Sequence, residues 1–450
     1  MKHNEQAHPG RREAGSIASA PVIAWQRPLN RRGIKTLGLA ALGGALEFYD
    51  FVIFVFFTAT IGQLFFPPDI PDWLRQLQAY GIFAAGYFAR PLGGLIMAHF
   101  GDRAGRKRMF TLSVFLMAVP TLLIGFLPVY SSIGYFAPLA LLVLRVLQGA
   151  AIGGEVPGAW VFVAEHVPAR RIGFACGLLT SGLTAGILIG SLVATGINLS
   201  LTPDQIHDYG WRLPFIAGGF FGFFAVYLRS WLQETPIFIE IQRRKALSLE
   251  LPLKAVLKYH GKAVLVSVLA TWTLTAAIVV LILMTPNLLQ KLAGFSPLAT
   301  LTANSVATFT LAISCVLAGA AADRFGAVRV MVIGGICLAA SGYLLYLGAT
   351  HVPNMLLPLY AVTGFCVGTI AVVPFIMVRV FPPAVRFTGV SFAYNIAYAV
   401  FGGLTPLVVV RLSASDPLAP AHYVAAIVFI GILAVFGHSR WARIGSIDRA

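Results

Sequence analysis

The sequence predicts an all-α membrane protein, built from twelve transmembrane helices in two six-helix bundles. Composition, the length of the apolar runs and an internal repeat lead to this prediction. Of the 450 residues, 58% are hydrophobic and only 11% are charged, and the mean hydropathy is +0.81. A soluble protein carries about 25% charged residues, so this chain cannot cover a water-facing surface of ordinary composition. Composition therefore excludes a soluble enzyme, a nucleic-acid-binding domain and a disordered scaffold.

Twelve runs of the chain are apolar over the roughly 20 residues that a membrane-spanning helix needs. Strands of a membrane barrel are only about 10 residues long and alternate in polarity. These runs do not alternate, so helices are predicted. The runs are 36–58, 79–100, 109–129, 134–163, 172–198, 212–232, 262–289, 299–321, 328–349, 354–378, 387–411 and 421–438. The fourth run is the least regular, because it contains Arg145 and Glu155.

The positions of lysine and arginine predict the orientation. With the N-terminus inside, 27 of the 33 basic residues fall in inner segments, 4 in outer loops and 2 within spans, as the positive-inside rule requires. Both termini are therefore expected in the cytoplasm, and the net charge of +16 needs no nucleic-acid partner. The 4 cysteines fall in apolar runs without metal-ligand spacing, so neither a disulfide nor a metal site is expected.

The chain also repeats itself. An Asp-Arg-x-Gly motif begins at Asp102 and again, in the second half of the chain, at Asp323. A Pro-Ala pair begins at Pro168 and again, at nearly the same offset, at Pro383. Two halves in the same orientation are predicted, with the substrate site between them near the bilayer midplane. The predicted parts are a tail at 1–35, a first bundle at 36–232, a linker at 233–261, a second bundle at 262–438 and a tail at 439–450.

Ionisable residues within the spans are candidate functional residues, since each costs roughly 2.5–3.5 kcal/mol at mid-bilayer. Glu47 and Asp50 are three residues apart and share a helix face. Two carboxylates in a low-dielectric site cannot both ionise cheaply, so one of them is expected to hold a proton. Arg145 and Glu155 are further candidates for proton coupling. Arg90 and Arg145 each present a fork of donors that suits an anionic substrate. The alternative is that these charges form buried ion pairs that only fix helix packing.

The second half has no Asp, Glu, Lys or Arg in the middle of a span. We therefore expect the first half to supply charge and proton, and the second half to supply hydrogen bonds and aromatic surface. Simple aromatic packing is the alternative. Besides the two arginines, the predicted substrate-binding residues are Tyr49, Gln148, Trp272, Tyr394, Asn395 and Tyr398.

Several motifs, in order, resemble the major facilitator superfamily and, within it, the metabolite:proton symporter family. The run 101–108 (Gly-Asp-Arg-Ala-Gly-Arg-Lys-Arg) is similar to the superfamily's loop signature, and Arg145-x-x-Gln148-Gly149 to its second signature. Four further segments resemble the metabolite:proton symporter family: residues 46–51, 90–94, 211–215 and 234–236. The resemblance spans about residues 36–440. It implies a secondary transporter in a bacterial inner membrane, driven by a proton gradient and without a cofactor. A monomer suffices if the site lies between the two halves, and the oligomeric state is left open.

The same resemblance implies that two loops latch the halves together at the cytoplasmic side. A plain positive anchor at the membrane surface is the alternative for the basic residues. The predicted gating residues are Asp102, Arg103, Gly105, Arg106, Asp323 and Arg324. In the fifth run, Gly182, Gly186 and Gly190 recur every four residues, which predicts a face for close helix packing.

The leading functional prediction is proton-coupled symport of a small organic acid, such as citrate or a related di- or tricarboxylate, by alternating access. One alternative is proton symport of a zwitterion such as proline or betaine, or of a shikimate-like acid. An alternative of another class is a transporter-like receptor or sensor. No Walker loop, metal constellation or nucleophile arrangement is evident in the sequence, so catalysis is not expected.

Overall fold

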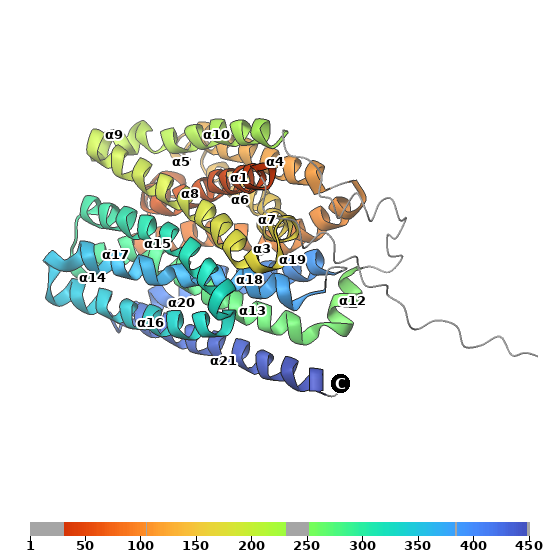
Figure 1. The fold of residues 1–450 in the computed structure, drawn as a ribbon. Helices are drawn as coiled ribbons and strands as arrows, with labels where there is room; N and C mark the ends of the chain where they lie inside the picture. The colour runs from red at the N-terminus through yellow and green to blue at the C-terminus, as the bar shows by residue number, and fades with distance from the viewer. Residues whose placement is uncertain (1–30, 105, 231–251, 383–384, 448–450) are drawn as a thin grey trace, which may run out of the picture.

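The computed structural model describes residues 31–104, 106–230, 252–382 and 385–447. Within these ranges every regular element is helical (Figure 1). One end of the molecule, here called the linker end, contains α12 (Pro252–Tyr259) and the first residues of α8 and α19. The opposite end, here called the far end, contains α9 and α14.

The helices before the linker cover the first six predicted runs. They are α1 (Arg31–Phe56), α2 (Thr58–Phe65), α3 (Asp72–Ala104), α4 (Arg106–Phe126), α5 (Tyr130–Ile133), α6 (Phe136–Ile152), α7 (Glu155–His166), η2 (Ala169–Arg171), α8 (Ile172–Ser200), α9 (Pro203–Gln205), η3 (Ile206–Gly210) and α10 (Arg212–Ser230). Helix α1 packs against α8 and α10, α3 against α6, and α4 against α10.

The helices after α12 cover the last six runs. They are α13 (Gly261–Ala276), η4 (Ala277–Met284), α14 (Thr285–Ala293), α15 (Pro297–Phe325), α16 (Ala327–His351), η5 (Pro353–Met355), α17 (Leu356–Val367), η6 (Gly368–Ala371), α18 (Val372–Val380), α19 (Arg386–Ala397), η7 (Tyr398–Gly402), α20 (Gly403–Ser413) and α21 (Ala419–Ile447). Across the linker, α8 packs along α15, and α3 packs against α19.

The number of spans stays partly a prediction. Eight helical stretches of the described residues are long and apolar enough to cross a membrane, and the number rises to 10 if two bent pairs each count as one span. The bent pairs cover the first and sixth runs, at 48–65 and 203–228. Helices α3 and α4 occupy the second and third runs, and α3 carries Arg75 and Arg90.

Several helix boundaries differ from the sequence prediction. Helix α1 begins at Arg31, inside the predicted tail, and α21 continues to Ile447, inside the other predicted tail. Helix α3 begins at Asp72, ahead of the predicted run, because polar residues at its first turns contact the preceding loop: Arg75 donates from Nε to the carbonyl oxygen of Pro67 at 3.2 Å. Residues 233–251 of the predicted linker lie outside the described residues, as do 231–232 at the end of the first predicted bundle, and α12 follows them.

Glycines let helices approach to backbone contact, as the sequence predicts for the fifth run. A Cβ at Gly186 of α8 would overlap the carbonyl oxygen of Ala45 in α1, and one at Gly182 would overlap Ala41. At Gly190 the space is ordinary, with the nearest atom, a methyl of Val52, at 3.6 Å. Packing against α1 is therefore tightest over the first two of the three predicted glycines.

The internal repeat of the sequence corresponds to a close backbone contact between two helices that occurs once in each half. A Cβ at Gly149 of α6 would overlap the carbonyl oxygen of Gly86 in α3. A Cβ at Gly364 of α17 would overlap the carbonyl oxygen of Ala307 in α15. The second pair follows the first at the same sequence offsets that relate the two copies of the repeated motifs. The two-bundle division at 232 and 262 stays a prediction that this repeat supports.

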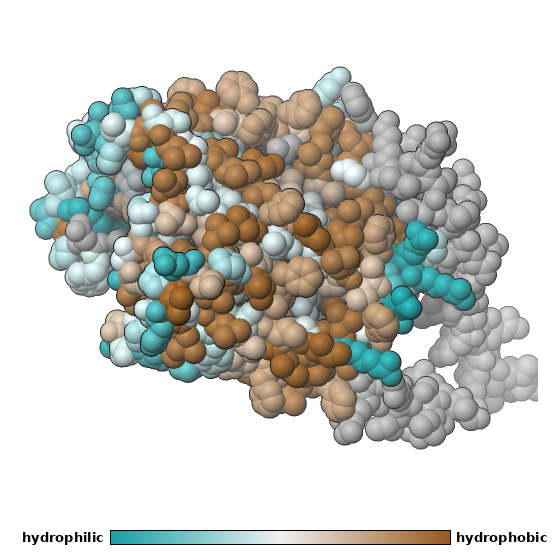
Figure 2. Space-filling view, turned by 60° about the vertical axis from the view of Figure 1, so that its left-hand side comes forward, coloured by the Kyte–Doolittle hydropathy of each residue, from teal (hydrophilic) through white to brown (hydrophobic). Residues whose placement is uncertain are grey.

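The surface fits a lipid environment. Figure 2 shows an apolar surface across the middle of the molecule, with hydrophilic residues gathered toward its ends. Large apolar side chains such as Phe220, Phe309 and Ile333 are more than half exposed. A protein in water would bury such residues, whereas a lipid bilayer solvates them.

Candidate functional site

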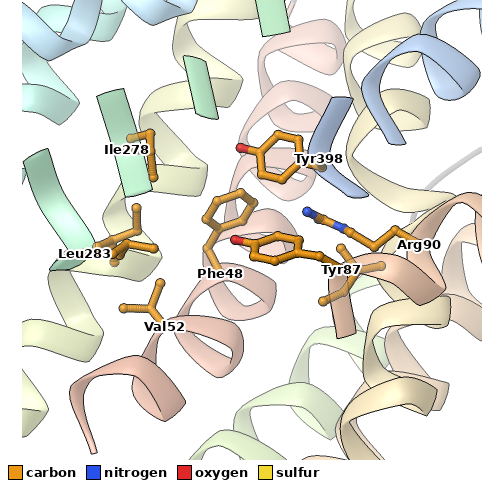
Figure 3. A pocket seen from close by; sticks show the side chains of 9 residues that line it. Phe48, Val52, Tyr87, Arg90, Ile278, Leu283 and Tyr398 are labelled. Carbon is orange, nitrogen blue, oxygen red and sulfur yellow. The ribbon is translucent and has the colours of Figure 1, made fainter. Parts of the chain in front are cut away.

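A small cavity lies between helices from before and after the linker (Figure 3). Arg90 is the charged side chain among its lining residues, and the others are aromatic or aliphatic. The cavity has a volume of about 10 Å³, which is about what one water molecule needs. The lining residues are Phe48, Val52, Tyr87, Arg90, Ile152, Ile187, Ile278, Leu283 and Tyr398.

Irregular helix geometry surrounds this cavity. Ile278 and Leu283 belong to η4, and Tyr398 begins η7, and both segments are π-helices. Such segments are rare and frequently occur at functional sites. On the other side, Gly153 and Gly154 separate α6 from α7, and a Cβ at Gly153 would overlap the carbonyl oxygen of Arg90. The cavity therefore lies where helices that could form the fourth, seventh and eleventh spans depart from regular geometry.

Arg90 extends from α3 toward a group of tyrosine rings (Figure 3). Its guanidinium carbon lies 4.7 Å from the ring centre of Tyr398, 5.3 Å from that of Tyr87 and 5.7 Å from that of Tyr394. Tyr87 precedes Arg90 by three residues on the same helix, so both side chains share one face. The tyrosine faces carry negative potential that attracts the cation.

A second group connects Asp50 to Arg145 inside the helices before the linker. Arg145 donates from Nη1 to Oε1 of Gln148 at 2.9 Å, and Nε2 of Gln148 donates to the hydroxyl of Thr121. The Thr121 hydroxyl in turn bonds Oδ2 of Asp50. Asp50 and Arg145 are both almost fully buried, with exposed fractions of 2% and 1%. The Arg145 guanidinium also lies 4.1 Å from the ring centre of Phe54.

The Thr121 hydroxyl makes this chain sensitive to a proton on Asp50. A hydroxyl has one hydrogen to donate, and Thr121 lies within bonding distance of two acceptors, Asp50 Oδ2 and the Met117 carbonyl oxygen. An ionised Asp50 accepts that hydrogen. A protonated Asp50 can instead donate to Thr121, which then donates to Met117. The protonation state of Asp50 thus sets the direction of the Asp50–Thr121 hydrogen bond, while Gln148 and Arg145 act as donors in either state.

One oxygen of the Asp50 carboxyl group lacks a hydrogen-bond partner. Within the part of the chain that the structure describes, Asp50 Oδ1 is buried and has no hydrogen-bond partner. A Cβ at Gly218 of α10 would lie 2.7 Å from that oxygen, so the glycine makes the room that the carboxyl group occupies. A buried polar oxygen without a hydrogen bond is costly, so Oδ1 is the part of this carboxyl group that the described residues do not satisfy.

The other predicted site residues lie apart from the cavity. Tyr49 is fully buried and donates to the carbonyl oxygen of Pro214 at 2.9 Å. Trp272 stacks on Phe401 and donates to the hydroxyl of Tyr423 at 3.1 Å. None of these side chains is among the described residues that line the cavity.

Two further predicted groups lie at the break between α6 and α7. Glu155 begins α7, is 1% exposed, and accepts a hydrogen bond from Ser113 Oγ at 3.1 Å. Asn395 of α19 donates to the carbonyl oxygen of Gly153, across the linker. Glu47 lies on α1, and its side chain lies outside the described residues.

At the linker end, the two sets of helices contact each other through described polar residues. Asp323, at the last turn of α15, accepts from the backbone N–H groups of Gly173 and Phe174, each at 2.8 Å. These groups belong to the first turn of α8, where the helix dipole attracts an anion. Arg386 of α19 lies 3.7 Å from Glu165 of α7.

The predicted gating residues divide between described and undescribed positions. Asp323 joins α15 to α8, while Arg324 is exposed and lies over the ring of Phe325. Gly326 follows with φ of 90°, a backbone conformation that favours glycine. Of the first copy, Gly105 and the side chains of Asp102, Arg103 and Arg106 lie outside the described residues.

We expect an Asp323→Ala variant to open the linker end. It removes two hydrogen bonds to a charged group, each worth about 1.5–3 kcal/mol. The population of the form that is open at the linker end should therefore rise at least about ten-fold. Cys176 and Cys315 are buried beside α15 and α8 and serve as reporters. The measurement is their labelling rate by a water-soluble maleimide, with Cys337 and Cys366 replaced by alanine.

The matched control for this experiment is Asp69→Ala, which changes an exposed loop carboxylate. Equal labelling of Asp323→Ala and the control would show that Asp323 does not hold this end closed.

At the far end, α8 and α15 also touch. Ser191 Oγ donates to the carbonyl oxygen of Leu301 at 3.2 Å and lies 2.9 Å from Ser305 Oγ. The same two helices thus meet on both sides of Ile187, the residue of α8 that lines the cavity.

Sequence reasoning missed several residues of these groups. Tyr87 could have been found, because it lies one helical turn before Arg90. Thr121 and Ser113 gave no signal, since lone hydroxyls are common in membrane helices. The pair Glu165 and Arg386 could not be matched from sequence, because its members lie in different halves of the chain.

Comparison with known proteins agrees with this architecture. The family profile described as Major Facilitator Superfamily matches residues 51–406, which is most of the chain. The chain belongs to the major facilitator superfamily. It is therefore a multi-pass membrane transporter of the secondary type.

Among its relatives, the transporter is 32% identical over 413 residues to a putative proline/betaine transporter of Staphylococcus aureus (strain COL), covering 90% of this chain and 88% of that protein. It is 30% identical over 419 residues to the glycine betaine/proline/ectoine/pipecolic acid transporter OusA of Dickeya dadantii, covering 89% of this chain and 82% of that protein.

A solved structure of the proton:xylose symporter XylE has the same fold as this transporter. The match has a TM-score of 0.72 at 17% sequence identity and covers 90% of this chain and 94% of that chain. At this identity the likeness concerns the fold alone.

Proposed function

We propose that the transporter carries a small zwitterion, such as proline or glycine betaine, in symport with a proton. One observation carries this proposal: of the nine described residues that line the cavity, Arg90 alone is charged, and it faces aromatic rings. A di- or tricarboxylate brings two or three negative charges, which would need several buried cations. A zwitterion brings no net charge and one carboxylate, which matches one arginine fork.

The relatives support the same choice. Their printed names are proline/betaine and glycine betaine/proline/ectoine/pipecolic acid transporters. These names agree with the alternative drawn from the sequence, a zwitterion. They give no support to the leading prediction of citrate or a related organic acid.

We propose that Asp50 carries the coupled proton, together with the residues that connect it to Arg145. Asp50 is buried, has an oxygen without a hydrogen-bond partner among the described residues, and connects through Thr121 and Gln148 to Arg145. Arg145 and Arg90 emerge from α6 and α3, which touch at backbone distance at Gly149 and Gly86. A change at Asp50 can therefore reach the helix that carries Arg90 through rigid, close-packed contacts.

The proposal of alternating access rests on contacts between α8 and α15 at the linker end and at the far end. The cavity is too small for proline or betaine in this form, so the helices must separate at one end to admit the substrate. The contacts of α8 with α15 at Asp323 and at Ser191 are the ones to break in turn. We place the linker end in the cytoplasm, on the charge distribution of the sequence, and the bacterial inner membrane as the location. One chain supplies the whole cavity, so a monomer suffices.

The test is uptake by the full chain in proteoliposomes with an imposed inward proton gradient. Labelled proline and glycine betaine are compared with citrate, tricarballylate, 2-oxoglutarate and shikimate. We expect gradient-driven uptake of a zwitterion that a protonophore abolishes. Uptake of citrate in preference to the zwitterions would contradict the substrate class. Zwitterion uptake that is insensitive to the protonophore would contradict proton coupling.

A further inference from the structure

Three tyrosines surround the guanidinium of Arg90 and form a group, here called the tyrosine box, of Tyr87, Tyr394 and Tyr398. Figure 3 shows two of them, Tyr87 and Tyr398, beside Arg90. The rings touch one another: the centres of Tyr394 and Tyr398 are 4.5 Å apart, and those of Tyr87 and Tyr398 are 5.6 Å apart. All three are at most 3% exposed. The box is therefore a preformed and desolvated set of aromatic rings.

Both sides of the transporter contribute to the tyrosine box. Tyr87 comes from α3, before the linker, whereas Tyr394 and Tyr398 come from α19 and η7, after it. Trp160, in α7, packs against Tyr394 in a T-shaped arrangement, with the ring centres 5.0 Å apart. A ligand in the box would touch the two sets of helices at once, at the place where they must separate.

Aromatic faces bind cations, and quaternary ammonium groups are bound in this way by aromatic cages. In the closed form the occupant is an internal cation, the guanidinium of Arg90. Arg90 also carries donors that suit a carboxylate. The two functions compete, because the guanidinium cannot lie over the rings and follow a substrate carboxylate elsewhere in the cavity.

We propose that the tyrosine box is the binding subsite for the cationic group of the transported zwitterion, and that Arg90 occupies it as an internal substitute in the closed form. On binding, the substrate ammonium takes the place of the guanidinium, and the displaced Arg90 binds the substrate carboxylate. The carboxylate lies between two cations and offsets their repulsion. This inference rests on the proposed zwitterion substrate and adds where each of its charges binds.

The exchange makes a distinct prediction for three ligands of similar size. Glycine betaine has both a quaternary ammonium and a carboxylate. Its carbon isostere, 3,3-dimethylbutanoate, has the same shape and carboxylate but no cation. Choline has the cation but no carboxylate. Betaine should bind about thirty-fold more tightly than 3,3-dimethylbutanoate, on the scale of a desolvated cation–π contact.

The experiment measures the dissociation constants of these three ligands by calorimetric titration of the full chain in lipid nanodiscs. Tyr398→Leu removes the ring closest to the cation, and Tyr398→Phe keeps the ring and removes only the hydroxyl. The preference for betaine over its isostere should fall about three- to ten-fold in Tyr398→Leu and stay within about two-fold of wild type in Tyr398→Phe. A ratio within one variant is independent of how much of that variant is folded.

Arg90→Gln tests the proposed binding of the substrate carboxylate by the displaced Arg90. It empties the box of its internal cation and removes the carboxylate partner. The preference for betaine over choline should therefore fall at least about ten-fold, as expected for loss of a hydrogen bond to a charged group. Equal weakening of betaine and choline would overturn the role given to Arg90.

The outcomes separate this inference from the proposed function. If Tyr398→Leu and Tyr398→Phe prefer betaine over its isostere equally, the tyrosine box is not the cation subsite. If wild type still shows proton-driven betaine uptake, that result leaves the proposed symport unaffected. If the betaine preference is lost in Tyr398→Leu but kept in Tyr398→Phe, the tyrosine box is supported. If wild type shows no proton-driven uptake in the same series, proton symport is overturned. Failure of wild type to bind betaine more tightly than 3,3-dimethylbutanoate overturns the box directly.

Discussion

Replacing Asp50 with asparagine should abolish proton-driven accumulation of substrate while leaving exchange of substrate across the membrane. Asparagine keeps the shape that fits beside Gly218 and can still accept the Thr121 hydrogen bond. It cannot take up or release a proton. A gradient of one pH unit corresponds to about 1.36 kcal/mol per proton, which supports about ten-fold accumulation. With two units, wild type should accumulate substrate up to about 100-fold and Asp50→Asn should stay near one-fold.

The measurement is the final ratio of internal to external label in proteoliposomes, with the membrane potential clamped near zero. Counterflow, in which internal unlabelled substrate drives entry of label, reports exchange without a gradient. Asp69→Asn is the matched control, since it makes the same chemical change at an exposed position. Accumulation by Asp50→Asn equal to that of the control would place proton coupling elsewhere, and Glu155, buried at the start of α7, would be the next group to test.

Replacing Gly186 with valine should disrupt the packing of α8 on α1. Any Cβ at this position would overlap the carbonyl oxygen of Ala45 and approach the backbone nitrogen of Tyr49 to 2.9 Å. Backbone atoms cannot move aside as a flexible side chain can. Overpacking of this kind costs at least about 1–3 kcal/mol. The displaced segment of α1 includes Tyr49 and Asp50, so transport should fall together with stability.

The stability of this variant is measured as the apparent Tm and the yield of monodisperse protein after extraction. Gly196→Val is the matched control: it lies on the same helix, and a Cβ there would meet no atom within 4 Å. We expect a Tm lower by several degrees for Gly186→Val and little change for Gly196→Val. Equal effects would mean that valine disturbs the helix itself rather than its contact with α1.

Much of the fold could be predicted because membrane helices are defined locally. An apolar run of adequate length is sufficient to place a helix, and each of the twelve predicted runs coincides with helical residues. Helix ends were less predictable. Helix α3 begins before the apolar run, where polar residues bond the neighbouring loop, and α21 extends past the end of its run. Breaks inside helices, such as the one at Gly153, depend on a neighbouring helix and were not predicted.

The candidate site was predicted only in part. Buried charges identified Asp50, Arg90 and Arg145 as unusual, because the energetic penalty of a charge in lipid is a property of the residue and its depth. Their partners were not predictable. The structure connects Asp50 to Arg145 through Thr121 and Gln148, and it places Tyr49 against Pro214 instead of in the cavity.

The sequence by itself determined which segments are helical, which charges lie within them and, through its motifs, the superfamily. Hydropathy and residue chemistry are local quantities, so they can be read along one chain. The tertiary structure alone decided that Arg90 lies among tyrosines from both sides of the linker and that Asp323 binds the first turn of α8. Those contacts depend on how each helix is rotated and how closely its neighbour approaches. The local pattern leaves that rotation open, and glycines at the crossing points fix it by backbone contact.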